Sequence, residues 1–245
     1  MKKLNFILII FCISLFAGFL ASCDDDGYSL GDIYAPRLAT VVPLSDDAYY
    51  LRLDNGTTMW DVTGYPYRPK YNQRVIAYFT ILDDNVGNYD YYVKIHHLQE
   101  ILTKEVIDLI AENADSIGND PVKILRHWVG DDYLNIEFGF NVGGQKVHFI
   151  NLVNNTTETY PDDGKVYLEF RHNTNGDPSK KGANGIVSFD LKPYREVNRN
   201  SIDFVIKVKD FDGEKTVGFT YKPNGEESGE TDLNKDINYD ATQYN

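Results

Sequence analysis

Five histidines and 37 acidic residues are the side chains with which this sequence could perform acid–base or metal chemistry. A metal site needs three or four converging ligands, and no two histidines stand at HxH or HxxxH spacing. His148 is in phase with Ile150, and His172 with Phe170, which indicates histidines that face a core. No GxSxG, Walker A or GxGxxG motif is present, so the sequence predicts no catalytic residues, no metal and no cofactor. A glycan-active hydrolase stays open as an alternative, because a suitable pair of carboxylates could occur among so many acidic residues.

Cys23 is the residue for which the sequence predicts a covalent modification. Two lysines and an apolar run up to Leu20 form a signal-peptide core, and Leu20-Ala21-Ser22-Cys23 is similar to the lipobox of bacterial lipoproteins. We therefore expect residues 1–22 to be removed as a signal peptide, Cys23 to carry lipid such as palmitate, and residues 23–35 to form a polar tether. The lipid is expected to hold the protein on a membrane.

Three aspartates, Asp24-Asp25-Asp26, directly follow the cysteine. An acidic cluster at this place resembles the surface-export signal of Bacteroides-type lipoproteins. It predicts an outer membrane lipoprotein that is exposed on the cell surface. Retention at the inner membrane, which an acidic residue here directs in other Gram-negative sorting schemes, is the alternative.

The composition limits the class of partner. The expected mature chain has 22 basic and 37 acidic side chains, a net charge of −15. Such a chain repels phosphate backbones, so nucleic acid is excluded as a partner. Cys12 leaves with the signal peptide and Cys23 carries lipid, so no disulfide is available and packing alone must stabilise the fold.

Alternation of apolar and polar residues predicts two β-rich blocks. Residues 36–100 contain about five expected strands, with Asn55-Gly56 as a type I′ hairpin turn. Residues 122–221 contain about seven, which favours a sandwich.

The segments outside these blocks follow other patterns. Leu102, Val106, Leu109 and Ile110 recur at helical spacing, so residues 101–121 are expected to form a helix over 101–114 followed by a linker. Residues 222–245 are polar and acidic, and they predict a flexible tail.

The order of short motifs along the chain resembles the NigD-like lipoproteins of Bacteroides-type bacteria. The resemblance implies that the first block is an OB-like barrel and the second a β-sandwich. Together with the residue pattern, this predicts a mainly β fold with an N-terminal OB-like barrel, a short helical connection and a C-terminal antiparallel β-sandwich. It also implies a suspected role in bacteriocin immunity, and no catalytic residues. Besides the lipobox and its aspartates, the motifs are Leu53-Asp54-Asn55-Gly56, Gln73-Arg74-Val75, Leu102-Thr103-Lys104, Tyr133-Leu134-Asn135-Ile136-Glu137-Phe138, His148-Phe149-Ile150-Asn151-Leu152-Val153, Leu168-Glu169-Phe170-Arg171-His172-Asn173 and Val187-Ser188-Phe189-Asp190-Leu191.

Two segments are candidates for binding or modification. The first is the loop from Tyr65 to Tyr71, because its prolines pre-set the backbone and its tyrosines and arginine are frequent at interfaces. The alternative is that the tyrosine rings fold back onto the barrel. The second is Asp115-Ser116-Ile117, which resembles an O-glycosylation site at Ser116. The residues of the loop expected to bind are Tyr65, Tyr67, Arg68, Lys70 and Tyr71.

The sequence as a whole favours a non-catalytic binding or accessory module of the outer envelope. OB barrels can bind oligosaccharides on one face, and tyrosine rings suit sugars and protein surfaces alike. A protein or glycan partner is therefore expected besides the membrane. Bacteriocin immunity or another protective role in the envelope is the second reading.

Overall fold

The computed structural model describes residue 31 and residues 36–195, 200–223 and 244–245 of the 245-residue chain. Cys23, the signal peptide, nearly all of the tether and most of the acidic tail lie outside the described residues. Among the residues that are described, no helix is both long and apolar enough to cross a bilayer. The anchor predicted at Cys23 therefore stays a prediction.

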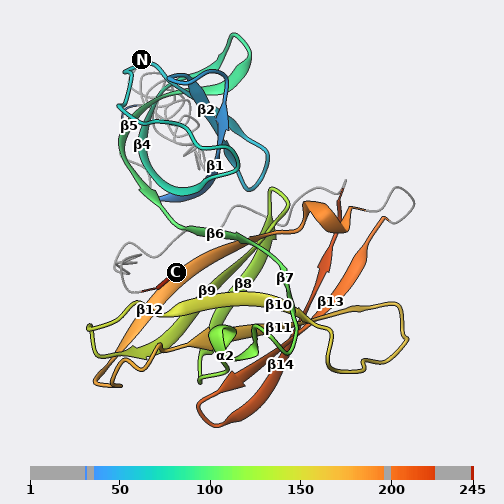
Figure 1. Ribbon diagram of the computed structural model, residues 1–245. Helices are drawn as coiled ribbons and strands as arrows, with labels where there is room; N and C mark the ends of the chain where they lie inside the picture. Colours follow the sequence, from blue (N-terminus) through green and yellow to red (C-terminus); the bar gives the residue numbers. More distant parts are fainter. Residues whose placement is uncertain (1–30, 32–35, 196–199, 224–243) are drawn as a thin grey trace, which may run out of the picture. The chain divides into compact units, whose positions relative to one another are not determined.

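The N-terminal block is a closed five-stranded barrel with strand order β1-β2-β3-β5-β4 (Figure 1). Alternate residues of its strands, such as Leu51, Met59 and Val75, are buried inside it. Irregularities in the β4–β5 ladder occur between Tyr78 and Phe79 and near Ile81, and such bulges bend long strands so that a barrel can close. The strands are β1 (Arg37–Pro43), β2 (Tyr49–Leu53), β3 (Thr58–Asp61), β4 (Arg74–Val86) and β5 (Tyr89–Glu100).

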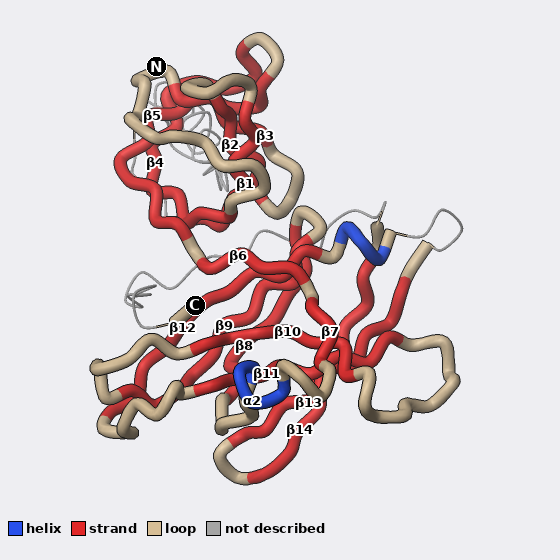
Figure 2. Tube along the Cα trace, in the orientation of Figure 1, coloured by secondary structure: helices blue, strands red, loops and turns tan. Residues whose placement is uncertain are grey.

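The C-terminal block is a β-sandwich of a five-stranded sheet, β14-β13-β11-β10-β7, and a four-stranded sheet, β6-β12-β9-β8 (Figure 2). Its core includes Phe138, Phe170, Phe189 and Phe204, which are almost completely buried. The strands are β6 (Leu102–Glu105), β7 (Ile107–Leu109), β8 (Lys123–Gly130), β9 (Tyr133–Val142), β10 (Phe149–Asn155), β11 (Val166–Asn173), β12 (Lys181–Asp190), β13 (Ile202–Asp210) and β14 (Gly213–Tyr221), with a 3-10 turn, η1 (Lys192–Tyr194).

The mainly β fold with an OB barrel and a sandwich is confirmed, but the sandwich is not purely antiparallel. β6 pairs with β12, β7 with β10 and β11 with β13 in parallel. The segment from 102 to 109 supplies the first two of these pairs, so it belongs to the sandwich and is not a separate connection.

The prediction of a helix over residues 101–114 is therefore wrong. The four apolar residues that recur at helical spacing do not share one face. Leu102 and Val106 pack on the main sandwich core, and Leu109 packs on Ile117 and Val153. Ile110 is exposed. Hydrogen bonds to β12 and β10 stabilise the extended backbone more than the local spacing favours a helix. The only helix in this segment is α2 (Ala114–Ile117).

The turn between β2 and β3 also differs in detail from the expectation. Only Gly56 has a positive φ, +83°, whereas a type I′ turn requires it at both central residues. The Gly56 N–H donates to the Leu53 carbonyl at 3.0 Å, and the Leu53 N–H donates to the Thr57 carbonyl at 2.8 Å. The loop therefore spans Asp54 to Gly56, and Asp54 becomes a loop residue.

The chain end is packed, in contrast to the free tail expected over residues 222–245. The Tyr244 ring is buried against Phe138 and Phe140, and its hydroxyl donates to the Ile186 carbonyl at 3.0 Å. The Asn245 N–H donates to the His148 carbonyl at 2.7 Å. The expectation is wrong for these last two residues, because a buried aromatic ring offsets the entropy of ordering the chain end.

Candidate binding site and buried polar clusters

Part of the loop from Tyr65 to Tyr71 is fixed against the barrel by one carboxylate of β5. The Tyr67 hydroxyl donates to Glu100 Oε1 at 2.9 Å, and Lys70 Nζ donates to Glu100 Oε2 at 2.7 Å. Burial and the hydrogen bond to Glu100 raise the pKa of Tyr67, so its phenol remains a donor. The Tyr67 ring also meets buried Tyr49 edge-on at 5.5 Å. Tyr67 and Lys70 therefore position the loop.

The remaining loop residues line an open pocket of about 670 Å³ beside the turn between β1 and β2. Arg68 and Tyr71 are exposed, and 82% of the Tyr71 surface is accessible. Asp46 and Asp47 lie in the turn that forms the other wall. Pro43, Leu44, Ser45 and Pro69 complete the lining.

The expected binding loop thus divides into two groups. Tyr65 is half-buried and its N–H donates to an Asp61 carboxylate oxygen at 2.5 Å; with Tyr67 and Lys70 it holds the loop. Only Arg68 and Tyr71 of the five expected residues face the pocket. The sequence did not predict the acidic wall, because Asp46 and Asp47 are separated from the loop by about 20 positions along the chain.

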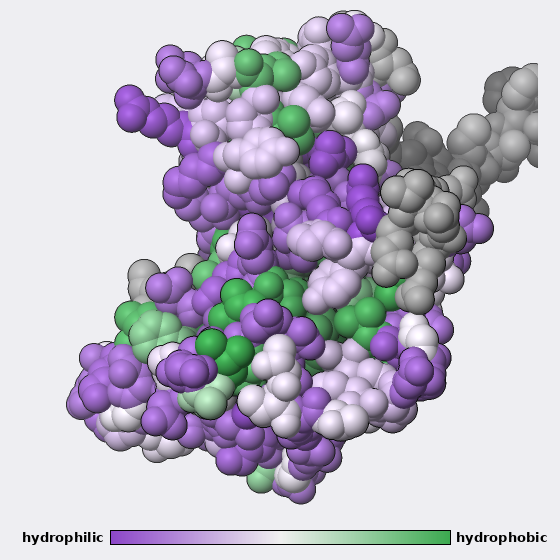
Figure 3. Space-filling view, turned by 45° about the vertical axis from the view of Figure 1, so that its right-hand side comes forward, coloured by the Kyte–Doolittle hydropathy of each residue, from purple (hydrophilic) through white to green (hydrophobic). Residues whose placement is uncertain are grey.

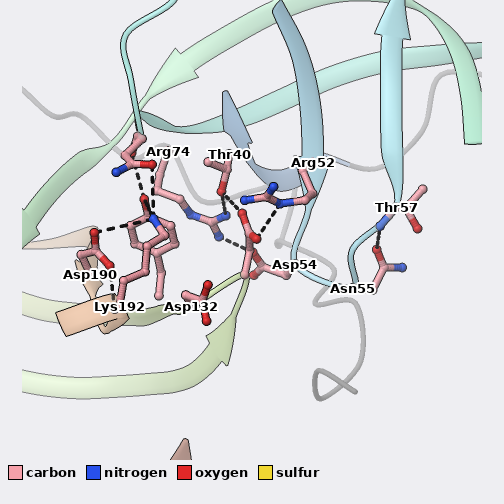
Figure 4. A network of polar contacts seen from close by, with 12 residues as sticks. Thr40, Arg52, Asp54, Asn55, Thr57, Arg74, Asp132, Asp190 and Lys192 are labelled. Carbon is pink, nitrogen blue, oxygen red and sulfur yellow. Dashed lines mark hydrogen bonds and ion pairs between the residues drawn. The ribbon is translucent and has the colours of Figure 1, made fainter. Parts of the chain in front are cut away.

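A second polar cluster is buried, and it connects strands of the barrel with strands of the sandwich (Figure 4). Arg74, the first residue of β4, is completely buried and forms an ion pair with Asp54. Its Nη1 donates to Thr40 Oγ1 at 2.8 Å. From the sandwich, Trp128 Nε1 donates to Asp54 Oδ2 at 2.9 Å, and Asn135 Nδ2 donates to the same oxygen at 3.3 Å. Asp54 is thus a shared acceptor for donors from both blocks.

The cluster extends through the tight turn between β8 and β9. Asp131, at φ +47°, accepts hydrogen bonds from Thr40 and from Arg52 Nε, the latter at 2.6 Å. Gly130 precedes it, and a Cβ there would lie 2.3 Å from Asp54 Cγ. Only glycine therefore allows Asp54 to approach the backbone of β8 this closely.

Several residues of this cluster come from the motifs that carried the family resemblance. Asp54, Arg74 and Asn135 each belong to one of these motifs, and Ser188, which donates to Asn135 Oδ1 at 2.6 Å, belongs to another. Sequence reasoning did not find the cluster, because its members are up to 148 positions apart, from Thr40 to Ser188, and each is unremarkable in its own strand or turn. Every charged group in it has a partner, so the cluster is suited to holding structure and leaves no free nucleophile or base.

Two histidines form a third buried cluster inside the sandwich, as their phase along the strands predicted. His148 Nδ1 lies 2.8 Å from His172 Nε2, and His172 Nδ1 lies 3.0 Å from the Pro121 carbonyl oxygen. Because a carbonyl can only accept, His172 Nδ1 carries a proton, which leaves its Nε2 to accept from His148. His148 Nε2 lies 3.2 Å from Asp177 Oδ2. No group of three or more histidine, cysteine or acidic side chains within the described ranges is arranged to hold a metal.

Ser116 lies in α2 and not in a linker. Its side chain is exposed, and its hydroxyl donates to the Asn113 carbonyl at 2.8 Å. Glycosylation of Ser116 stays a prediction.

The comparisons with known proteins follow the same division into two blocks. Residues 38–101 match the model of the NigD-like N-terminal OB domain, and residues 105–221 match that of the NigD-like C-terminal beta sandwich domain. The chain belongs to the NigD-like family. No curated protein matches it significantly.

Solved structures resemble the chain over most of its length. A toxin-related protein from Parabacteroides distasonis is 36% identical, with a TM-score of 0.68 over 79% of this chain and 95% of its own. A protein of unknown function from Bacteroides vulgatus is 32% identical, with a TM-score of 0.68 over 80% of this chain and 95% of its own. A NigD-like immunity protein from Bacteroides caccae is 24% identical, covers 80% of this chain and 100% of its own with a TM-score of 0.62, and supports the fold alone.

Proposed function

We propose that this protein is a non-catalytic binding module, anchored by lipid on Cys23 at the outer membrane and displayed on the cell surface. Its working surface is the pocket between the β1–β2 turn and the loop that ends at Tyr71. The membrane contact is the lipid, and the pocket takes a protein or glycan partner. On the face in Figure 3, hydrophilic side chains surround a smaller hydrophobic area, and this hydrophilic surface suits contact with water.

The observation that carries this proposal is the contrast between the buried clusters and the pocket. The charged groups of the Arg74 cluster are paired with one another inside the fold. In the pocket, by contrast, the side chains of Asp46, Asp47 and Arg68 have no hydrogen bond or ion pair to any other described residue. Exposed charges without a partner among the described residues, beside an exposed aromatic ring, are the groups that remain available to a ligand.

Substitution of Cys23 by serine is expected to release the protein from the membrane fraction. A serine hydroxyl cannot accept the diacylglycerol that a lipobox cysteine receives, and the protein without its acyl chains loses roughly 0.8 kcal/mol of membrane affinity per buried CH₂. Fractionation of cells and metabolic labelling with palmitate measure this. Unchanged membrane association together with label in the serine variant would contradict the anchor, and complete protection from added protease in intact cells would contradict surface display.

A photoreactive residue at position 71 tests the working surface without knowledge of the partner. Benzoylphenylalanine in place of Tyr71 is expected to give a discrete adduct when intact cells are irradiated. The matched control is the same residue in place of Phe211, which is a half-exposed aromatic residue of the sandwich away from the pocket. An equal adduct at both positions, or none at position 71, would overturn the proposed surface.

Bacteriocin immunity is the second candidate. It is favoured by the name of one relative, the 36% identical protein described as toxin-related. A toxin gene and its exporter beside this gene, together with loss of resistance to that toxin after deletion, would support it. Unchanged resistance in the deletion strain would rule it out.

A further inference from the structure

We propose that the pocket at the β1–β2 turn binds an uncharged glycan. This inference rests on the proposed function, because it names the partner of the same surface. Its volume of about 670 Å³ falls within the range of roughly 300–1,000 Å³ that is usual for small-ligand sites.

The hydrogen-bonding groups of the pocket match the hydroxyl groups of a sugar. Carboxylates accept two hydrogen bonds side by side, and the Asp46 and Asp47 carboxylates provide such acceptors. The Arg68 guanidinium provides donors in a planar fork. A sugar with adjacent hydroxyls both donates and accepts, so it can satisfy acceptors and donors that lie in the same pocket.

The apolar groups of the pocket match the C–H face of a sugar ring. Tyr71 is 82% exposed, and neither a ring contact nor a hydrogen bond ties its side chain to another described residue. An exposed ring with a polar handle is suited to a ligand that is apolar on one side and wet on the other. Leu44, which is 55% exposed, and the two prolines of the lining add further apolar surface.

The charges of the pocket disfavour the competing classes of ligand. The lining holds two carboxylates and one guanidinium, so phosphate polymers and acidic sugars meet a site with net negative charge. A folded protein partner requires about 800 Å² of surface on each side, and therefore contacts well beyond these residues. Two prolines restrict the pocket backbone, so that ordering it around a small ligand costs less entropy.

The test uses the mature chain carrying Cys23→Ser on an array of neutral mannose, galactose and N-acetylglucosamine oligosaccharides and of uronate-containing and sialylated ones. Binding to neutral members is expected, and calorimetry with the best of them should show a loss of about tenfold or more on Tyr71→Ala and on Asp47→Asn. The control Phe211→Ala should bind as the wild type does. Since all three side chains are exposed, the thermal midpoint should change little.

Three results would overturn the inference. Binding only to acidic glycans, no glycan binding, or binding that survives both pocket substitutions would each contradict it. If the array is negative while the photoreactive residue at position 71 captures a discrete protein on cells, the glycan is wrong and the binding surface stands. If both experiments fail, both proposals are wrong.

Discussion

Replacing Arg74 by alanine is expected to lower the free energy of unfolding by about 3–5 kcal/mol, the usual cost of breaking a buried ion pair on one side. The guanidinium is completely buried, and it pairs with an Asp54 carboxylate that is 4% exposed. Without it, Asp54 would keep only the Trp128 and Asn135 donors, and its charge would be uncompensated. Folded domains are stable by roughly 5–15 kcal/mol, so this single change removes a large share.

Urea unfolding at neutral pH measures this effect, and two further variants make it specific. Lys165→Ala removes a partner of the exposed Asp163 and is expected to cost far less, because water screens exposed ion pairs. Arg74→Met combined with Asp54→Leu removes both buried charges and is expected to recover much of the loss, because buried pairs are often replaceable by apolar residues. A loss for Arg74→Ala no larger than that for Lys165→Ala would contradict the structural role of the cluster.

The second large effect is a loss of stability in acid that depends on His172. Burial lowers the pKa of His172 to about 4, and the hydrogen bond to the Pro121 carbonyl only partly offsets this. In the unfolded chain a histidine has a pKa near 6.5. At pH values between about 4 and 6.5, the unfolded chain therefore binds a proton at His172 that the folded chain does not bind. By linkage, stability falls as the pH falls from about 6.5 to about 4, by an amount on the order of 3 kcal/mol.

Asp177 adds to this loss at lower pH. Burial opposes its ionisation, but hydrogen bonds from the backbone N–H of Gly143, from His148 and from two further backbone N–H groups outweigh burial and lower its pKa. A carboxyl group whose pKa is lowered by folding stabilises the protein above the unfolded value and loses this contribution as acid protonates it.

Urea unfolding at several pH values between 7 and 4 tests the role of His172. His172→Gln is expected to flatten the slope of stability against pH, although the variant is less stable at pH 7. The exposed His97→Gln is the matched control, and the slope of His172→Gln is compared with it. A slope that is the same in the wild type and in His172→Gln would contradict the assignment.

The sequence predicts best those features that depend on alternation alone. The barrel strands and the buried positions of His148 and His172 follow from residue phase along a strand. The segment 102–109 shows where this fails: a few apolar residues at helical spacing fit two structures, and pairing with the distant β10 and β12 decides between them. The buried place of Tyr244 depends in the same way on partners far away in the chain.

The candidate site was predictable to a smaller degree. Proline and tyrosine content pointed to the loop at 65–71, but nothing local shows that Glu100 fixes Tyr67 and Lys70 while Arg68 and Tyr71 stay free. Tyr67 and Tyr71 are the same residue type but take different roles, because only Tyr67 donates a hydrogen bond to Glu100. Glu100 lies on β5, 30 positions from Lys70, which it also binds. The buried Arg74 pair escaped notice for the same reason.

Competition for the adduct at position 71 measures most directly whether this protein works by binding through the barrel pocket. A soluble mature protein is added in excess to cells that display the photoreactive form. Its one substitution is Cys23→Ser, so its pocket is that of the wild type. We predict that it suppresses the adduct, and that the same soluble protein with Arg68→Ala and Tyr71→Ala does not. Equal suppression by both soluble proteins would contradict a binding surface at this pocket.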